Sequence, residues 1–469
     1  MYMNSISHDA TICAVSTAPG TGGVAVIRVS GPEAVAAVNA IYTPKKAGKT
    51  LLTQKAYTLT FGNIHRGDEL VDEVLVSLFR APHSFTGEDI VEVTCHGSVY
   101  IQQQILELLI GQGCRSAMPG EFTQRAFLNG KMDLSQAEAV ADLIASTSAG
   151  THKLALSQMR GGFSAELFKL RTQLLDFASL IELELDFSEE DVQFADRSNL
   201  HILASTIETV ISRLADSFRV GNAIKNGIPV AIIGETNAGK STLLNLLLNE
   251  DKAIVSDIHG TTRDVIEDTI NLKGITFRFI DTAGIRETTD TIESLGIERT
   301  YQKLEQASIV LWVIDLTSPD ALIETLAHVI VPKLEGKQPI LVFNKADLLT
   351  PMELEAKQNL LKQVQADKIV ISAKYKNNTD RLQTQLIAAA NLPEVGQNDI
   401  IVTNIRHYEA LIRALAAIQR VIDGMQNNIS SDFLAQDIRE CMHYLGEITG
   451  QISNDEILGN IFAKFCIGK

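Results

Sequence analysis

The hydrophobic positions of the chain follow three patterns, one in each of three parts. In residues 1–125, short segments rich in apolar and β-branched residues predict strands at 10–17, 23–31, 56–64, 72–80 and 89–96. Apolar residues recur at helical spacing in 32–42, with Pro32 near the first helical position, and in 99–110. The first part is therefore predicted to be an α+β domain.

Residues 126–224 and 386–469 have the pattern of packed helices. Apolar residues recur at i, i+3, i+4 and i+7 through most of 131–220 and again through 403–464. A segment of roughly 65 residues is marginal as an independent core, whereas packing on the upstream helices would bury its apolar faces. We therefore predict one helical domain made from two separate chain segments.

Between these segments, residues 225–385 contain short, mainly apolar runs, each followed by a polar motif. The runs are Ile228–Ile233, Ile275–Ile280, Ile340–Phe343 and Lys368–Ile371, and a helical stretch, Thr242–Leu248, follows the first. Such runs are typical of buried strands in a sheet covered by helices on both faces. The chain is thus predicted to be a multidomain α/β plus α protein, in which a Ras-like domain with a mixed sheet is inserted into the helical domain.

The turn after the first apolar run is a phosphate loop. Residues 234–241 read GETNAGKS, which is GxxxxGK[ST] between a strand and a helix. Backbone N–H groups of Asn237, Ala238 and Gly239 would hold the α- and β-phosphates, with Thr242 in the first helical turn. Lys240 would reach the β/γ oxygens and Ser241 would ligate Mg²⁺. The alternative is an ordinary strand-to-helix turn.

Three further motifs follow later apolar runs and favour GTP as the nucleotide. They are Asp281-Thr282-Ala283-Gly284, Asn344-Lys345-Ala346-Asp347 and Ser372-Ala373-Lys374. Asp281 would lie near Mg²⁺, and the Gly284 amide would sense the γ-phosphate. The Asp347 carboxylate can accept both hydrogens of guanine N1–H and its 2-amino group, which adenine lacks. Together the four motifs predict a GTPase.

Composition and charge limit the classes of protein to which the chain can belong. The chain has 469 residues, is 45% hydrophobic and contains 11 prolines, so a globular protein of several domains is expected. No apolar stretch is long enough for a membrane span, and the N-terminus lacks a signal core. The 5 cysteines form no CxxC pair, which suggests reduced thiols in the cytoplasm. A net charge of −16 is unfavourable for tight RNA binding by the chain alone.

Motifs along the whole chain resemble those of one family. They are TAPGTGGVAVIRVSG, SFTGEDIVEVTCHG, PGEFTQRAFLNGKMDLSQAEAVADLI, GETNAGKS, GTTRD, DTAGIRE and the terminal FCIGK. From about residue 9 to the end, the chain resembles the MnmE (TrmE) family of bacterial tRNA-modification GTPases. The resemblance implies an N-terminal tetrahydrofolate-binding domain that also forms a homodimer, a central helical domain and an inserted G domain.

The resemblance also implies partners and chemistry. Such proteins act with an FAD-dependent partner, MnmG, in a heterotetramer or larger complex. They add a carboxymethylaminomethyl or aminomethyl group to the wobble uridine of certain tRNAs, which are held mostly through the partner. A tetrahydrofolate derivative, in the 5-formyl or methylene form, supplies the one-carbon unit.

Candidate folate contacts follow from the same motifs. Arg28 and Lys131 would pair with the glutamyl carboxylates and Glu92 with pterin donors, while Lys469 is the terminal contact. Without the resemblance, each of these residues taken singly would be interpreted as part of an ordinary surface ion pair. Cys466 either takes part in one-carbon chemistry or is a packing contact that fixes the tail, and both interpretations remain open.

The hydrolysis site departs from the Ras pattern, since Ile285 follows the DTAG motif where a catalytic Gln would stand. The resemblance implies K⁺ in place of an arginine finger, held by Asn237, Ser256, Ile258 and Thr261. The surrounding loop, which also contains Asp257, His259 and Gly260, would close over the nucleotide, and Thr262 would ligate Mg²⁺. Glu293 aligns with the water-positioning glutamate, although its spacing alone suggests a surface helix residue.

Two other functions compete with this one. A ribosome- or RNA-assembly GTPase would act as a binding switch without modification chemistry, but such proteins carry basic RNA-binding modules. A folate-dependent enzyme could use its nucleotide domain only as a scaffold, but a scaffold has no need of Ser241, Thr262 and Asp281 together.

Overall fold

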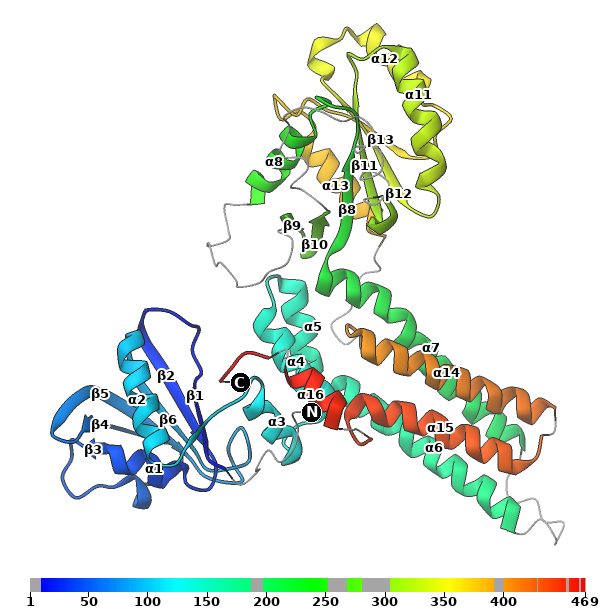
Figure 1. Ribbon diagram of the computed structural model, residues 1–469. Coiled ribbons are helices and arrows are strands. Elements are labelled where there is room, and N and C mark those ends of the chain that lie inside the picture. Colours follow the sequence, from blue (N-terminus) through cyan, green and yellow to red (C-terminus); the bar gives the residue numbers. More distant parts are fainter. Residues whose placement is uncertain are drawn as a thin grey trace. The chain divides into compact units, whose positions relative to one another are not determined.

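The computed structural model describes residues 10–186, 197–251, 268–280, 304–391, 400–427, 429–452, 455–463 and 465–468 (Figure 1). The chain divides into two compact units. The first comprises Met1–Ala145, Leu156–Glu208 and Arg413–Lys469, and the second comprises Ser146–Ala155 and Thr209–Ile412. The domain boundaries predicted at 125, 224 and 385 are finer than this division and stay predictions. No helix in the described ranges is long and apolar enough to cross a membrane.

The N-terminal part of the first unit is a seven-stranded sheet in the order β3-β4-β5-β6-β2-β1-β7. Helices α1 (Ala34–Ile41) and α2 (Val99–Gly111) cover one face, and alternate residues such as Ile27 and Val76 point into the core beneath them. The strands are β1 (Ile12–Val15), β2 (Gly22–Ser30), β3 (Tyr42–Pro44), β4 (Thr58–Arg66), β5 (Glu69–Phe79), β6 (Ile90–Gly97) and β7 (Arg115–Ser116), with a short 3₁₀ helix η1 (Leu51–Thr53).

The predicted elements of this domain are present, with one correction. Helix α1 begins at Ala34 rather than next to Pro32, and its N-cap is Glu33. It also ends before Tyr42, which is the first residue of β3. The helix is therefore shorter at both ends than its apolar pattern suggested, since Tyr42 packs in the core from a strand.

The first unit also contains a helical core built from distant segments. Helix α15 (Ser431–Thr449) packs against α6 (Gly162–Asp186), and Arg439 of α15 pairs with Glu182 of α6. The downstream helices thus share a core with the upstream ones, as predicted. The other helices are α3 (Glu121–Leu128), α4 (Leu134–Ala145), α5 (Ala149–Met159), α7 (Arg197–Asn226), α14 (Ile405–Gln426) and α16 (Asp455–Phe462), and the unit boundary falls within α5, α7 and α14.

The second unit contains a six-stranded sheet in the order β13-β12-β11-β8-β10-β9. Only β9 runs antiparallel to its neighbour, so the sheet is mixed, as predicted. The strands are β8 (Ile228–Ile233), β9 (Asp268–Leu272), β10 (Ile275–Phe279), β11 (Ile309–Asp315), β12 (Gln338–Asn344) and β13 (Asp367–Val370).

Helices lie on both faces of this sheet. Val230 and Ile232 of β8 pack with α8 (Lys240–Asp251) and α13 (Thr379–Ala389). Ala231 and Ile233 point to the other face, toward α11 (Asp320–Ile330) and α12 (Pro351–Leu360). Short 3₁₀ turns, η2 (Val331–Leu334) and η3 (Ala346–Leu348), follow α11 and β12. The phosphate loop, the 344–347 motif and the 372–374 motif therefore lie at the carboxyl ends of parallel strands, where α/β sheets bind ligands.

Candidate functional site

The phosphate loop links β8 to α8 and has the backbone that its sequence requires. Asn237 is left-handed, with φ 63°, and Gly239 has φ 96°. A Cβ on Gly239 would lie 2.2 Å from Nδ2 of Asn344, so the glycine allows a close approach of the guanine motif. Lys240 Nζ donates to the carbonyls of Gly234 at 2.8 Å and Glu235 at 2.6 Å, which holds its amine over the loop.

The Asn344 side chain joins three of the predicted motifs. Its Nδ2 donates to the carbonyl of Ala238 in the phosphate loop at 2.8 Å, and its Oδ1 accepts from the N–H of Ala373 at 3.0 Å. Asn344 is buried, whereas Asp347 is exposed and accepts from Ser372 Oγ at 2.6 Å. The structure thus brings together the phosphate loop, the guanine motif and the 372–374 loop.

Asp315, at the end of β11, is a further member of this site that was not predicted. It pairs with Lys345 at 2.5 Å and accepts from the hydroxyl and N–H of Thr317. Burial alone would raise the pKa of Asp315, but the hydrogen bonds from Lys345 and Thr317 outweigh it, and the pKa lies below its ordinary value. The continuous apolar run before Asp315 marks a buried strand and could have pointed to it.

In the N-terminal sheet, Arg28 and Glu92 form a pair across β2 and β6. They are directly opposite in register, and Arg28 Nε donates to Glu92 Oε1 at 2.9 Å. The guanidinium also lies 5.4 Å from the Phe85 ring and 5.6 Å from the Phe122 ring. Both charged groups are only partly exposed, on the sheet face opposite α1 and α2. A cation and a carboxylate are thus presented together beside aromatic rings.

The C-terminal tail reaches the same domain. The Ser16 hydroxyl donates to the carbonyl of Gly468 at 3.0 Å, and a Cβ on Gly468 would lie 2.2 Å from the carbonyl of Val15. The carbonyl of Cys466 accepts from the N–H of Gly120 at 3.3 Å, while its thiol is exposed. The tail therefore lies beside the end of β1, the strand that pairs with β2, on which Arg28 lies.

Curated proteins resemble this chain over its whole length. A relative from Bacteroides thetaiotaomicron, described as tRNA modification GTPase MnmE, is 68% identical over 462 residues, which is 98% of this chain and 99% of that protein. One from Flavobacterium johnsoniae, with the same description, is 54% identical over 99% of this chain and 100% of its own length. The chain belongs to the MnmE family of tRNA modification GTPases.

Two family profiles agree with this assignment of the MnmE family. The profile "GTP-binding protein TrmE N-terminus" matches residues 11–131, and "MnmE helical domain" matches 134–466. A solved structure of Era from Aquifex aeolicus bound to GDP and AlF₄⁻ is 30% identical to this chain, covering 40% of it and 66% of that chain with a TM-score of 0.28. As a member of this family the chain is a GTP-binding GTPase, and the metal of its nucleotide chemistry is Mg²⁺.

Several predicted site residues of this MnmE protein lie outside the described residues. They are Ser256, Asp257, Ile258, His259, Gly260, Thr261, Thr262, Asp281, Thr282, Ala283, Gly284, Glu293 and Lys469. Of the expected Mg²⁺ ligands the structure places Ser241, in the first turn of α8, and of the K⁺ ligands it places Asn237. The remaining folate candidate, Lys131, donates to the carbonyl of Pro82 at 2.9 Å, in the loop that also carries Phe85.

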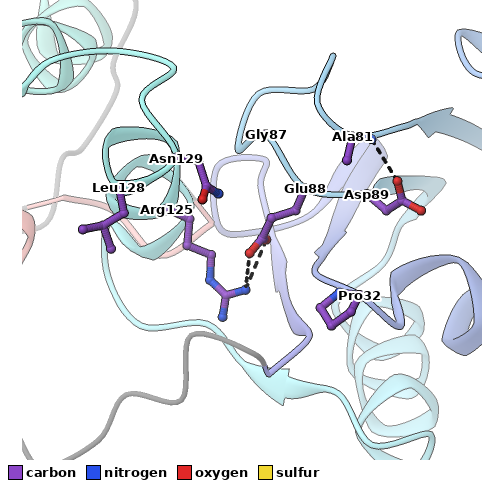
Figure 2. A pocket seen from close by; sticks show the side chains of 8 residues that line it. All are labelled: Pro32, Ala81, Gly87, Glu88, Asp89, Arg125, Leu128 and Asn129. Carbon is purple, nitrogen blue, oxygen red and sulfur yellow. Dashed lines mark hydrogen bonds and ion pairs between the residues drawn. The ribbon is translucent and has the colours of Figure 1, made fainter.

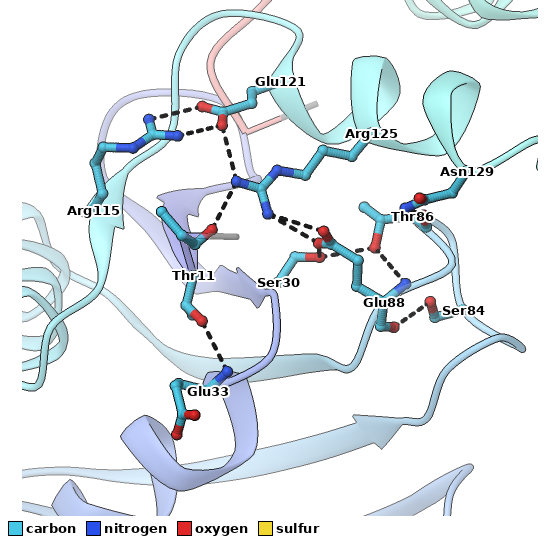
Figure 3. A network of polar contacts seen from close by, with 11 residues as sticks. Thr11, Ser30, Glu33, Ser84, Thr86, Glu88, Arg115, Glu121, Arg125 and Asn129 are labelled. Atoms are coloured by element: carbon cyan, nitrogen blue, oxygen red, sulfur yellow. Dashed lines mark hydrogen bonds and ion pairs between the residues drawn. The ribbon is translucent and has the colours of Figure 1, made fainter. Parts of the chain in front are cut away.

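A buried polar network, centred on Arg125, lies beneath that loop in the MnmE N-terminal domain (Figure 3). Arg125 donates to both oxygens of Glu88, at 3.0 and 3.1 Å, and to Glu121 at 3.1 Å. Ser30 Oγ donates to Glu88 at 2.7 Å, and Arg115 pairs with Glu121 at 2.5 Å. The sequence did not single out these residues, because charged side chains are expected at the surface until their burial is known.

A pocket of about 550 Å³ lies beside this network. Its lining includes Glu88 and Arg125, which point toward each other, together with Asn129, Asp89 and Pro32 (Figure 2). Arg125 is 3% exposed, and within the described residues its Nε has no hydrogen-bond partner. The network fixes the 82–89 loop, because Asn129 Nδ2 also donates to the carbonyl of Thr86 at 2.7 Å.

Proposed function

We propose that this protein hydrolyses GTP in a cycle that drives modification of tRNA. With an FAD-dependent partner of the MnmG type, it would add a carboxymethylaminomethyl or aminomethyl group to C5 of the wobble uridine of certain tRNAs, in the cytoplasm. The observation that carries the nucleotide part is the buried Asn344, which bonds the phosphate loop at Ala238 and the 372–374 loop at Ala373. This joins the phosphate-binding and base-binding elements into one site.

The described residues suit guanine and Mg²⁺. The Asp347 carboxylate is exposed at the end of the guanine motif and is oriented by Ser372, so it can accept from guanine N1–H and the 2-amino group. Ser241 lies in the first turn of the helix whose N-terminus would face the phosphates, and its hydroxyl is a hard oxygen ligand of the kind Mg²⁺ prefers. Replacement of Asp347 by Asn should weaken GDP binding and raise affinity for xanthosine diphosphate.

We further propose that K⁺ activates hydrolysis through Asn237. Asn237 is exposed in the phosphate loop, and its left-handed backbone, φ 63°, is one that asparagine adopts more readily than most residues. A cation there would stabilise charge that develops at the β–γ bridge. The test is GTP turnover in K⁺ against Na⁺ at equal ionic strength, for the wild type and for Asn237→Ala.

Asn378→Ala is the matched control, because Asn378 has the same φ of 63° and lies in the same unit, at the N-cap of α13. We expect stimulation by K⁺ in the wild type and in N378A, and its loss in N237A. Equal wild-type rates in the two salts would refute K⁺ activation. The alternative function, a ribosome- or RNA-assembly switch, would then be favoured. In that case a group supplied by a partner would stabilise the charge that develops during hydrolysis.

The folate proposal rests on the Arg28–Glu92 pair and the docked tail. A guanidinium suits the carboxylates of a 5-formyl or methylene tetrahydrofolate, and a carboxylate suits pterin donors. Arg28→Met should abolish most binding of 5-formyltetrahydrofolate in calorimetry. Arg66→Met is the control, since Arg66 pairs with Glu107 at 2.7 Å on the exposed surface of the same domain. Equal affinities of the two variants would refute the site.

A homodimer is proposed through the sheet face that carries this pair. Val24, Leu59, Phe61 and Leu75 are 65%, 60%, 46% and 39% exposed on these strands. A second copy would cover such an apolar surface and bring two folate sites together. Phe61→Glu should shift the protein toward the monomer in sedimentation velocity, and an unchanged dimer would contradict this interface.

The modification step itself separates the competing functions. Mass spectrometry of tRNA nucleosides, with the FAD-dependent partner added, should show the modified uridine. Cys466→Ser, which alters an exposed thiol, should abolish modification and spare GTP turnover if Cys466 takes part in one-carbon chemistry. Full modification by C466S would instead make Cys466 a packing contact. GTPase activity without any modification would favour the assembly switch.

A further inference from the structure

The phosphate loop contains a carboxylate that is hydrogen-bonded to a turn on another strand. Glu235 follows the first glycine of the loop, and its Oε1 accepts from Ser318 Oγ at 2.6 Å. Ser318 lies in the turn between β11 and α11, so this contact joins two neighbouring elements of the sheet. Both side chains are half-buried.

The turn that presents the Ser318 hydroxyl is itself fixed. The N–H of Ser318 donates to the carbonyl of Asp315 at 3.1 Å, and its own carbonyl accepts from Lys357 Nζ. Lys357 also pairs with Asp320 at 2.6 Å, at the start of α11. The hydroxyl therefore has a defined position from which it can hold the Glu235 carboxylate.

The backbone of Glu235 also contacts Lys240, the lysine that would bind phosphate. Its carbonyl accepts from Lys240 Nζ at 2.6 Å and from the N–H of Ala238 at 3.3 Å. A carboxylate free to rotate from this backbone position would reach the region where loop amides and Lys240 bind phosphate. There it would repel the phosphates and compete for the lysine.

We propose that Ser318 is a positioning residue for the nucleotide site. Its hydroxyl holds the Glu235 carboxylate away from the phosphates and from Lys240. It also couples the phosphate loop to the turn that begins at Asp315, the partner of Lys345 in the guanine motif. The inference rests on the nucleotide site of the proposed function and concerns how tightly that site retains its nucleotide.

The test is a double-mutant cycle on release of a fluorescent GDP analogue, measured by stopped flow on the full chain. Ser318→Ala should release it about fivefold to tenfold faster at low salt, as expected for a unit charge that gains access to the phosphates. The difference should shrink at about 0.5 M salt, because screening weakens it. In the E235Q background, S318A should have less than about a twofold effect, since the charge is gone.

Two conservative variants complete the design. Ser318→Thr retains the hydroxyl and should release nucleotide more slowly than S318A. Glu235→Asp retains the charge but is one methylene shorter, so it should lose the bond to Ser318 and release nucleotide faster than the wild type. This variant tests the inference independently if S318A does not fold. Wild-type release by S318A or E235D, or an equal effect of S318A with and without E235Q, would overturn the inference. A wild type that binds no GDP analogue would instead overturn the proposed function.

Discussion

Replacement of Asn344 by alanine should damage both the stability of the nucleotide domain and its affinity for GDP. The side chain is 3% exposed and makes two hydrogen bonds, to the carbonyl of Ala238 and from the N–H of Ala373. Without it, two backbone groups beside the phosphate loop lose a partner, and each such buried group costs about 1–3 kcal/mol. Because water can enter the space and restore part of this, we expect a loss of about 2–4 kcal/mol in total.

The single tryptophan of the chain gives a local assay. Trp312 is buried in the centre of β11, opposite Leu341 of β12, so its fluorescence reports unfolding of this sheet. Urea unfolding followed at this residue should show the lower stability of N344A. Calorimetry should show GDP binding weakened by about 30-fold or more, which corresponds to 2 kcal/mol.

Two variants test whether the loss of stability and of GDP affinity comes from the two hydrogen bonds of Asn344. Asn344→Asp keeps the shape and the oxygen that accepts from Ala373, but it places an oxygen 2.8 Å from the carbonyl of Ala238, so it should be at least as harmful as alanine. Asn226→Ala removes an exposed bond to Asn222 and should change neither measurement. If N344A unfolded within about 0.5 kcal/mol of the wild type and bound GDP equally well, Asn344 would not join the motifs energetically.

Three further predictions concern the N-terminal domain. Arg125→Met leaves the buried Glu121 and the half-buried Glu88 without their shared partner and should destabilise the domain by about 3–5 kcal/mol in denaturant unfolding. The exposed Arg66→Met should cost less than about 1 kcal/mol. Burial raises the pKa of Glu121, but the interactions with Arg115, Met118 and Arg125 outweigh burial and lower the pKa below its ordinary 4.5. The Glu121 carboxylate therefore contributes fully to stability above pH 4.5, and this contribution is lost as the pH falls through the lowered pKa. Glu121→Gln should flatten this part of the stability profile, and an unchanged slope would contradict the assignment. Gly468→Ala places a Cβ 2.2 Å from the carbonyl of Val15 at a φ of 92°, so it should detach the tail and weaken binding of 5-formyltetrahydrofolate, whereas wild-type affinity would separate the tail from the folate site.

The pattern of apolar residues was sufficient for most strands and for the position of the phosphate loop. Ile228–Ile233 was predicted as a strand with the bounds that the structure has, because turn residues stop it at both ends. Strand β11 was not predicted, although all of its residues are buried in the middle of the sheet. Its end carries none of the recognised nucleotide-binding motifs, and these motifs are what distinguished the other strands of this sheet.

Contacts between distant residues could not be read from the sequence. Four charged residues look like surface charges in the sequence, namely Glu88, Arg115, Glu121 and Arg125. Only the fold shows that they form ion pairs with one another in one network centred on a buried arginine. Likewise, Asp315 and Ser318 acquire their roles from neighbours at Lys345 and Glu235. The motifs were sufficient to locate the nucleotide site, whereas the residues that orient those motifs could be identified only once the strand order was known.

The two connections of the nucleotide domain to the helices lie side by side. A Cβ on Gly221 of α7 would lie 2.0 Å from the carbonyl of Val402, whose N–H donates to Ser217 Oγ at 3.0 Å, and Phe218 stacks on Tyr408 at 4.6 Å. Guest domains are tolerated where their two ends leave the host close together. The GTPase can therefore be treated as a removable cassette, and a short glycine bridge from Asn226 to Ile401 should yield a host protein that still folds.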